Sequence, residues 1–286
     1  KNLSDAEQIL DKGLENLYAY VYSITPHDIV VDILSTRYDY SNLSSALKAS
    51  WLQEGKEHPH FILASPIPAE EFDAFTDPNN DLFESRLPSH LLNGGLDARA
   101  LYEESESASV VNTFLDRQMF GWMLALAESL GNDFIINYIK ACIDFYNISV
   151  LIEQRIYSKQ RSFLEPFFVQ GGRIAAENIS SKFSRSAPAV FPSYYHKYFG
   201  EILQKEVSEW EKKSDPNKLH LLLEQLLFSM TEKVDYINYG VEIVFAYILS
   251  REEEINKIRL LLRGKSNDIS PKEIREDITN PFLKEL

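Results

Sequence analysis

The sequence has a single cysteine and no long uncharged hydrophobic run. Cys142 alone cannot form a disulfide within the chain, which fits a reducing compartment. It lies on an apolar helical stripe, so we expect a small buried side chain there and not a nucleophile. No stretch of the length that a bilayer requires is free of charge, and the most apolar window, 243–249, is short. We therefore expect no direct insertion of the chain into lipid.

Basic residues are also scarce. The sequence has 29 Lys and Arg against 43 Asp and Glu, a formal net charge of −14. A chain this acidic repels phosphate backbones, which argues against nucleic acid as a partner. It also argues against direct adsorption to anionic lipid, because that attraction requires clusters of Lys and Arg.

The usual motifs of catalysis are missing as well. Gly171-Gly172 marks a turn, but it lacks the GxxxxGK[ST] and GxGxxG frames of phosphate-binding loops. The sequence has no GxSxG, HExxH or cysteine-based pair. An all-α enzyme that handles prenyl diphosphates would need clustered acids such as DDxxD for magnesium, and none is present. We expect no catalytic residue, no cofactor and no metal site.

Helix signals run through the whole sequence. Capping boxes occupy 4–7 and 270–273, and Thr25-Pro26 is a typical helix start. Apolar stripes of helical spacing follow these starts, Gly94-Gly95 predicts a break, and no convincing series of strands is present. The fold class is therefore all-α. Helices are expected after Ser4, from Thr25 to Gly55, and near 110–130, 134–156, 199–213, 217–233, 239–263 and 274–278.

Three features recur in the same order along the chain and indicate an internal repeat. The clearest is an acid followed three residues later by asparagine, with Asn147 lying 105 residues after Asn42. The third copy is blurred between the registers that begin at Glu253 and Glu254. The full set comprises the preceding acids Glu15, Asp116 and Glu224, the pairs Asp39/Asn42 and Asp144/Asn147, and turn-helices at 67–72, 174–179 and 269–274.

The spacing predicts three pseudo-symmetric helical repeats at 1–108, 109–217 and 218–286. The third repeat stops soon after its turn-helix, whereas the first two continue for tens of residues. A missing N-terminal segment could complete it and close the three units into a ring-like body. That completion is a hypothesis from the sequence.

The stretch Tyr239–Tyr247, followed by Arg251–Ile255 and Arg259, resembles the C subunits of the bacterial and archaeal V-type (A-type) rotary ATPases, which are relatives of the eukaryotic d subunit. The two acid-x-x-Asn pairs and Gly171–Ile174 are similar to that family too. Single motifs are weak, and the resemblance depends on their order across essentially the whole chain.

This resemblance implies a funnel-shaped, non-catalytic central-stalk adaptor without a nucleotide. It would lie on the cytoplasmic side of the membrane as a peripheral protein, on the proteolipid rotor ring, and would receive the foot of the central-stalk axle. There it would transmit torque between ATP hydrolysis or synthesis and proton or sodium ion transport. Two alternatives remain open. One is a generic all-α repeat scaffold, which should have shorter repeats. The other is an all-α enzyme.

Six residues of the repeated motifs are candidates for function, and they have two interpretations. They either contact the axle or ring, or they form hydrogen bonds and ion pairs that hold the helical repeats together. We favour the structural interpretation because each residue lies beside an apolar stripe, where buried polar groups need partners. The candidates are Asp39, Asn42, Asp144, Asn147, Glu254 and Arg259.

Overall fold

The computed structural model describes residues 3–52, 59–77, 85–157, 167–191, 193–213, 216–236 and 238–282. These residues are mostly helical and contain no strand, which confirms the all-α prediction. The chain divides into two compact units, Lys1–Gly131 and Asn132–Leu286. Each unit has its own core and is described by itself. The three repeats and the funnel shape stay predictions.

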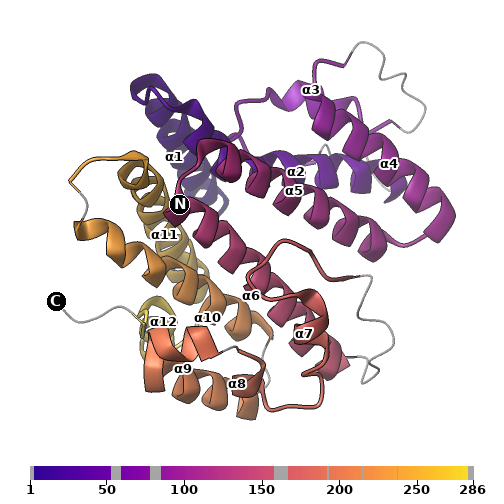
Figure 1. The fold of residues 1–286 in the computed structure, drawn as a ribbon. Helices are drawn as coiled ribbons and strands as arrows, with labels where there is room; N and C mark the ends of the chain where they lie inside the picture. The colour runs from indigo at the N-terminus through magenta and orange to yellow at the C-terminus, as the bar shows by residue number, and fades with distance from the viewer. Residues whose placement is uncertain are drawn as a thin grey trace. The chain divides into compact units, whose positions relative to one another are not determined.

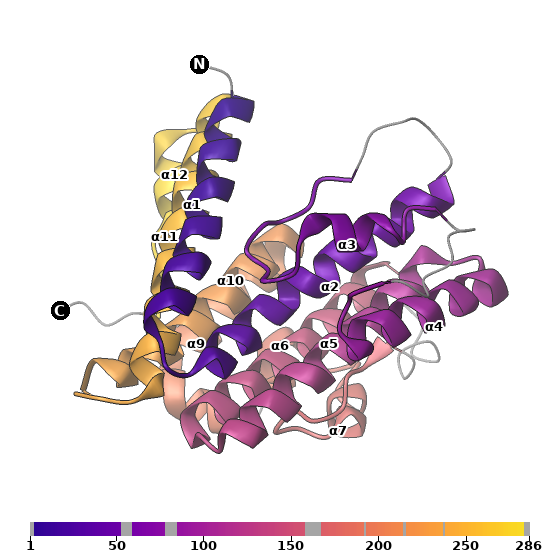
Figure 2. The same ribbon diagram turned by 90° about the horizontal axis from the view of Figure 1, so that it is seen from above.

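Unit 1 is built around the helix α2, Asp28–Leu52 (Figures 1 and 2). α5 (Ala108–Leu130) packs along it, and α1 (Leu3–Ile24), α3 (Ala69–Asp73) and α4 (Ser89–Ser105) also contact it. The core of this unit contains the buried residues Tyr40, Leu43, Ala46, Leu47, Phe72, Phe75, Leu87, Leu91, Ala98, Val111 and Leu115.

The helix α4 corrects one prediction from the sequence. Gly94-Gly95 was expected to break the chain, but both glycines lie inside α4 and are buried. They have a packing role, because a side chain at Gly95 would overlap the ring of Phe75 and come within 3.1 Å of Leu43. Two glycines weaken a helix, but here they let it approach its neighbours closely.

Unit 2 is built around α6, Asp133–Tyr157, which contacts α7 (Ala176–Ser180), α10 (Pro216–Ser229) and α11 (Val241–Ser266). Tyr138 packs edge-on against Phe245 of α11. The remaining elements are α8 (Ala187–Val190), α9 (Ser193–Lys213), the 3-10 helix η4 (Met230–Tyr236) and α12 (Pro271–Ile278).

One helical segment of the described chain, Asp133–Arg155 in α6, is long and apolar enough to cross a membrane by length and composition. Of its apolar window, 67% is buried inside the protein, as expected for the core helix of a compact unit. The segment also carries charge at Lys140 and Asp144. Burial therefore accounts for its apolar character.

Two helix boundaries follow local signals, whereas Ser4 lies inside α1 and α2 begins two residues after Pro26. Gly131 ends α5 with φ of 69°, a left-handed conformation that glycine adopts readily. Ser270 caps α12, because its hydroxyl accepts a hydrogen bond from the Glu273 N–H at 3.2 Å. These ends agree with the helix expected near 110–130 and with the capping box at 270–273.

The substitution Gly95→Ala should destabilise unit 1 by about 2 kcal/mol, because the added methyl group overpacks a filled core. Gly121→Ala in α5 is the matched control. It also lies inside a helix, but a side chain there would meet no atom within 4 Å. The control should stabilise the protein by about 0.5 kcal/mol. Urea unfolding measures both effects, and equal changes in the two variants would contradict the packing role of Gly95.

Candidate functional site

The two clear copies of the repeated motif use asparagine in the same way. Asn42 Nδ2 donates to the Ile62 carbonyl at 2.9 Å, and the Ile62 N–H donates to Asn42 Oδ1 at 2.8 Å. Asn147 forms the same two bonds with Val169, both at 2.8 Å. One amide thus satisfies a backbone donor and acceptor of the loop that follows its helix. We call this arrangement the asparagine clamp.

The aspartate of each motif binds the same loop further along. Asp39 accepts a hydrogen bond from the Ser65 hydroxyl, which in turn accepts one from the Ile67 N–H at 2.9 Å. Asp144 accepts from the Ile174 N–H at 3.0 Å and from the Tyr195 hydroxyl at 2.8 Å. Ser65 and Ile174 lie in the segments that lead to α3 and α7, whereas Tyr195 belongs to α9.

Gly172 shows why the loop of unit 2 can approach α6 so closely. Any side chain at this position would overlap Asp144 Oδ1, and its first carbon would lie 3.2 Å from Ile143. Its neighbour Gly171 has φ of 98°, which favours glycine. The glycine pair therefore has a structural task, which is to bring the backbone onto a buried carboxylate.

Both aspartates have pKa values above the ordinary range. Burial raises the pKa of Asp39 to about 7, the nearby Asp32 adds to the shift, and the bond from Ser65 opposes it. Burial also raises the pKa of Asp144 to about 6. Here the hydrogen bonds of Ile174 and Tyr195 and the charge of Arg173 oppose the shift. More groups oppose the rise of the pKa at Asp144 than at Asp39.

The third copy of the motif differs from the other two. Glu254 is exposed and pairs with Arg251 at 2.6 Å, and Arg259 donates to Asn256 at 3.3 Å. Asn256 is exposed as well, so this amide does not form a clamp. Glu254 and Arg259 therefore lie outside the arrangement that Asp39, Asn42, Asp144 and Asn147 share.

Position along the helix identifies a better counterpart in α11. Asp39, Asp144 and Glu252 each lie eleven residues after the first residue of their helix. All three are buried. Three residues later α11 carries Ile255 where the other helices carry asparagine. The sequence has three consecutive glutamates here, so it does not show which of them corresponds to Asp39 and Asp144. The burial of Glu252 distinguishes it from the other two.

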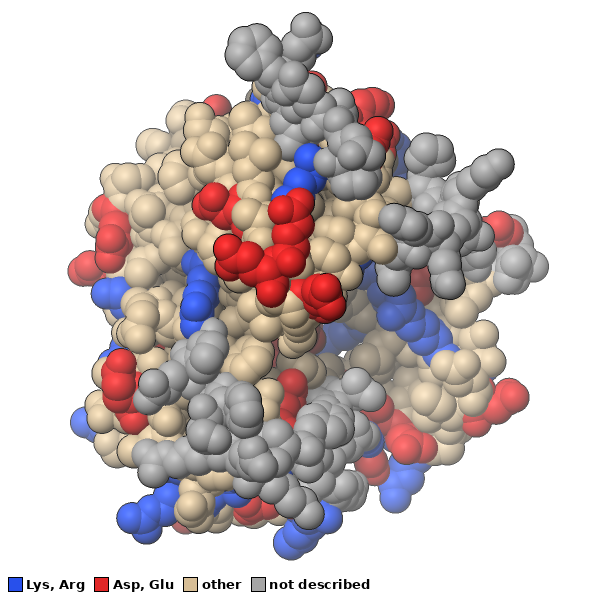
Figure 3. Space-filling model, turned by 90° about the vertical axis from the view of Figure 1, so that its right-hand side faces the viewer, with Lys and Arg blue, Asp and Glu red and all other residues tan. Residues whose placement is uncertain are grey.

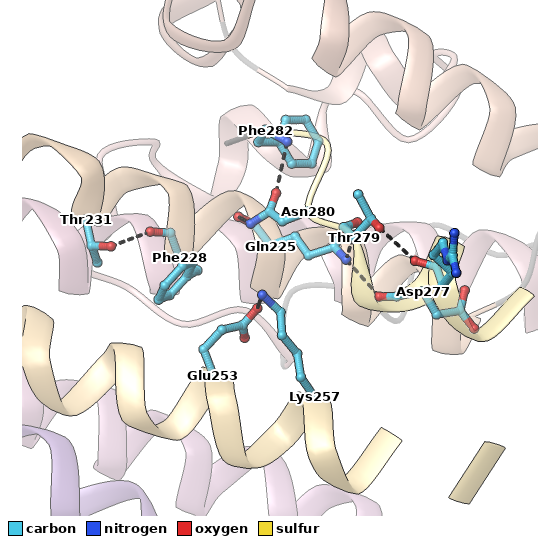
Figure 4. A network of polar contacts seen from close by, with 10 residues as sticks. Gln225, Phe228, Thr231, Glu253, Lys257, Asp277, Thr279, Asn280 and Phe282 are labelled. Atoms are coloured by element: carbon cyan, nitrogen blue, oxygen red, sulfur yellow. Dashed lines mark hydrogen bonds and ion pairs between the residues drawn. The ribbon is translucent and has the colours of Figure 1, made fainter. Parts of the chain in front are cut away.

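A different amide pair fastens the end of unit 2 (Figure 4). Gln225 of α10 donates to the carbonyls of Asp277 and Thr279 at 3.1 and 3.3 Å. Asn280 Nδ2 donates to the Gln225 carbonyl at 2.9 Å, and the Phe282 N–H donates to Asn280 Oδ1 at 2.9 Å. Side-chain amides again form hydrogen bonds with the backbone at and after the end of a helix, here α12. In this case one of the two amides, Gln225, comes from another helix, α10.

The hydrogen bonds of Asp39, Asn42, Asp144 and Asn147 each lie within one predicted repeat, whereas the sequence suggested contacts between repeats. Their chemistry is that of a structural joint, in which buried polar groups are paired and rigidly placed. In the ranges that the structure describes, no three His, Cys, Asp or Glu side chains gather as ligands for a metal ion.

Comparison with known proteins gives matches over nearly the whole chain. A family model described as ATP synthase (C/AC39) subunit matches residues 1–277. The chain is 23% identical to the C subunit of the V-type sodium ATPase of Enterococcus hirae, over 95% of this chain and 81% of that protein. It is 20% identical to the C subunit of the A-type ATP synthase of Methanocaldococcus jannaschii, over 94% and 70%. The corresponding A-type protein of Pyrococcus abyssi is 21% identical over 96% and 75%.

Asn147→Ala should lower the free energy of unfolding by about 2 to 4 kcal/mol, because it leaves a buried N–H and C=O of Val169 without partners. Asn256→Ala, at an exposed position of α11, should change it by less than about 0.5 kcal/mol. Urea unfolding followed by circular dichroism compares the two variants. A similar loss in both would contradict the clamp.

The raised pKa of Asp144 predicts a pH-dependent stability that Asp144→Asn removes. The folded state holds the proton of this carboxyl more tightly than the unfolded state does. The protonated carboxyl of Asp144 therefore contributes to the free energy of unfolding in full below about pH 4, and this contribution is lost as the pH rises through about 6. The free energy of unfolding of the natural chain should fall by about 2 kcal/mol relative to the variant over this range. Parallel curves for the two proteins in urea titrations from pH 4 to 8 would refute the prediction.

Proposed function

The chain belongs to the ATP synthase (C/AC39) subunit family, and from this membership we propose that it is the central-stalk adaptor of a V- or A-type rotary ATPase. It is a subunit of such a complex and is associated with the membrane through it. As the adaptor it seats the axle of the central stalk on the proteolipid ring and transmits torque between them. The single observation that carries this proposal is the match of the family model to residues 1–277.

The internal bonding of the chain supports a mechanical role without catalysis. A body that transmits torque must resist deformation, and its loops are the segments most easily deformed. In this chain the buried side chains of the asparagine clamps and the two aspartates form hydrogen bonds with the loops that follow α2 and α6. Close-packed helical cores add to this rigidity.

The surface charge supports attachment through protein partners. The chain has a net charge of −14, and on the face shown in Figure 3 the Lys and Arg side chains are scattered, while several Asp and Glu side chains gather near its centre. Binding to anionic lipid or nucleic acid needs clustered basic side chains. We infer that a protein ring on the cytoplasmic side holds this subunit to the membrane.

Co-purification with rotor-ring and axle subunits from the same complex tests the proposal. The natural chain should retain both partners, and recovery with neither would contradict the adaptor role. A generic repeat scaffold would bind neither partner.

Asp144→Ala separates the structural interpretation of the motif from a partner contact. We expect its melting temperature to fall by about 3 to 8 °C, because the Ile174 N–H and the Tyr195 hydroxyl lose their acceptor. Binding to the axle should persist well below that melting temperature. Normal melting together with lost axle binding would instead show that Asp144 is a partner contact.

A further inference from the structure

The helices α2 and α5 run antiparallel in unit 1 (Figures 1 and 2) and leave a cavity of about 340 Å³ between them. Ser41 is exposed, so this cavity opens to solvent. We call it the α2–α5 pocket. Polar side chains line most of it, although the same two helices bury an apolar core on another face. Its lining residues are Arg37, Tyr40, Ser41, Ser44, Ser45, Lys48, Asn112, Leu115, Asp116 and Met119.

The charge of the pocket is opposite to that of the chain. Two of its lining residues, Arg37 and Lys48, are basic and one, Asp116, is acidic, while the whole chain has a net charge of −14. The bond between Ser44 and Asn112 sets the register of the two antiparallel helices. Asp116 lies one turn after Asn112, and therefore toward Arg37 and away from Lys48. The Lys48 end of the pocket is thus the basic end.

Two hydrogen-bond donors at this end lack acceptors among the described residues. Lys48 pairs with no carboxylate in the part of the chain that the structure describes. The Ser44 hydroxyl donates to Asn112 Oδ1 at 3.1 Å, which leaves the Nδ2 donors of that amide available. The Ser45 hydroxyl donates to the Ser41 carbonyl, so its hydrogen is already used. An ammonium and an amide together favour an oxyanion.

We propose that the Lys48 end of the α2–α5 pocket binds a carboxylate, supplied by an acidic side chain of a partner protein in the complex. This inference rests on the proposed function for the identity of the partner. The carboxylate accepts hydrogen bonds from Lys48 Nζ and Asn112 Nδ2 and neutralises the lysine. Charge complementarity selects this occupant, because a basic pocket in an acidic chain attracts an acidic group that the rest of the surface repels.

Asn112→Asp is the sharpest variant, because it has nearly the same shape and keeps the oxygen that accepts from Ser44. It places a negative charge opposite Lys48 and removes the amide donor. Asn256→Asp is the matched control, since it makes the same change of charge at an exposed position of α11 in the other unit. Lys48→Gln removes the cation alone.

Titration of the isolated protein with glutarate at low ionic strength, followed by NMR chemical shifts, tests the site. The natural chain and the Asn256→Asp control should bind glutarate alike. Asn112→Asp should lose binding, and Lys48→Gln should weaken it by about tenfold. Equal shifts in the natural chain and Asn112→Asp, or no binding by the natural chain, would overturn the carboxylate site.

Co-purification with axle and ring subunits then tests the source of the carboxylate. We expect Asn112→Asp to lower recovery of one partner while the control retains it. If Asn112→Asp loses glutarate but assembles normally, the site takes a free anion and the partner assignment is wrong. If the natural chain recovers neither partner, the proposed function fails, while the glutarate result still decides whether the site exists.

Discussion

A loop that lies against a buried helix must find hydrogen-bond partners for its own N–H and C=O groups. In this chain, buried side chains of the helices α2 and α6 supply these partners. Asn42 and Asn147 each satisfy both groups of one loop residue with a single side chain. An unpaired buried backbone group lowers the free energy of unfolding by about as much as a lost hydrogen bond does. Because each amide pairs two such groups, it stabilises the fold by more than a single polar contact would. The aspartate three residues earlier fastens the same loop at a second point, and Gly172 provides the space that unit 2 needs for it.

The joint has an energetic cost, which is the burial of a carboxylate. Both aspartates have raised pKa values, so neither environment fully compensates for the loss of water. In exchange, the described residues Ile62, Ser65, Val169 and Ile174 are held in place against α2 and α6. A catalytic group would be expected to face a cleft, whereas these acids are buried against hydrogen-bond donors of their own unit, Ser65 for Asp39 and Ile174 and Tyr195 for Asp144. Rigid connections of this kind suit a member of a rotary ATPase that we propose to carry torque without doing chemistry.

Much of this could be predicted from the sequence. Apolar stripes and capping residues identify the long helices, and the spacing of Asp39/Asn42 and Asp144/Asn147 singles out the joints. Their partners could not be predicted, because Tyr195 lies 51 residues from Asp144 and tertiary contact alone brings them together. The helix through Gly94-Gly95 was missed, since the packing of Phe75 overrides the low helix propensity of glycine. Glu252 could not be singled out among three consecutive glutamates, because its burial depends on tertiary packing that the local sequence does not encode.

The central claim is that asparagine clamps hold the loops after α2 and α6 as firmly as the helices themselves. Native-state hydrogen exchange of the Ile62 and Val169 amides tests it most directly, because these two N–H groups are the ones that the clamps bind. The account predicts that both amides exchange as slowly as those in the middle of α2 and α6. Exchange at the rate of an open loop, in a protein whose helices remain protected, would contradict it.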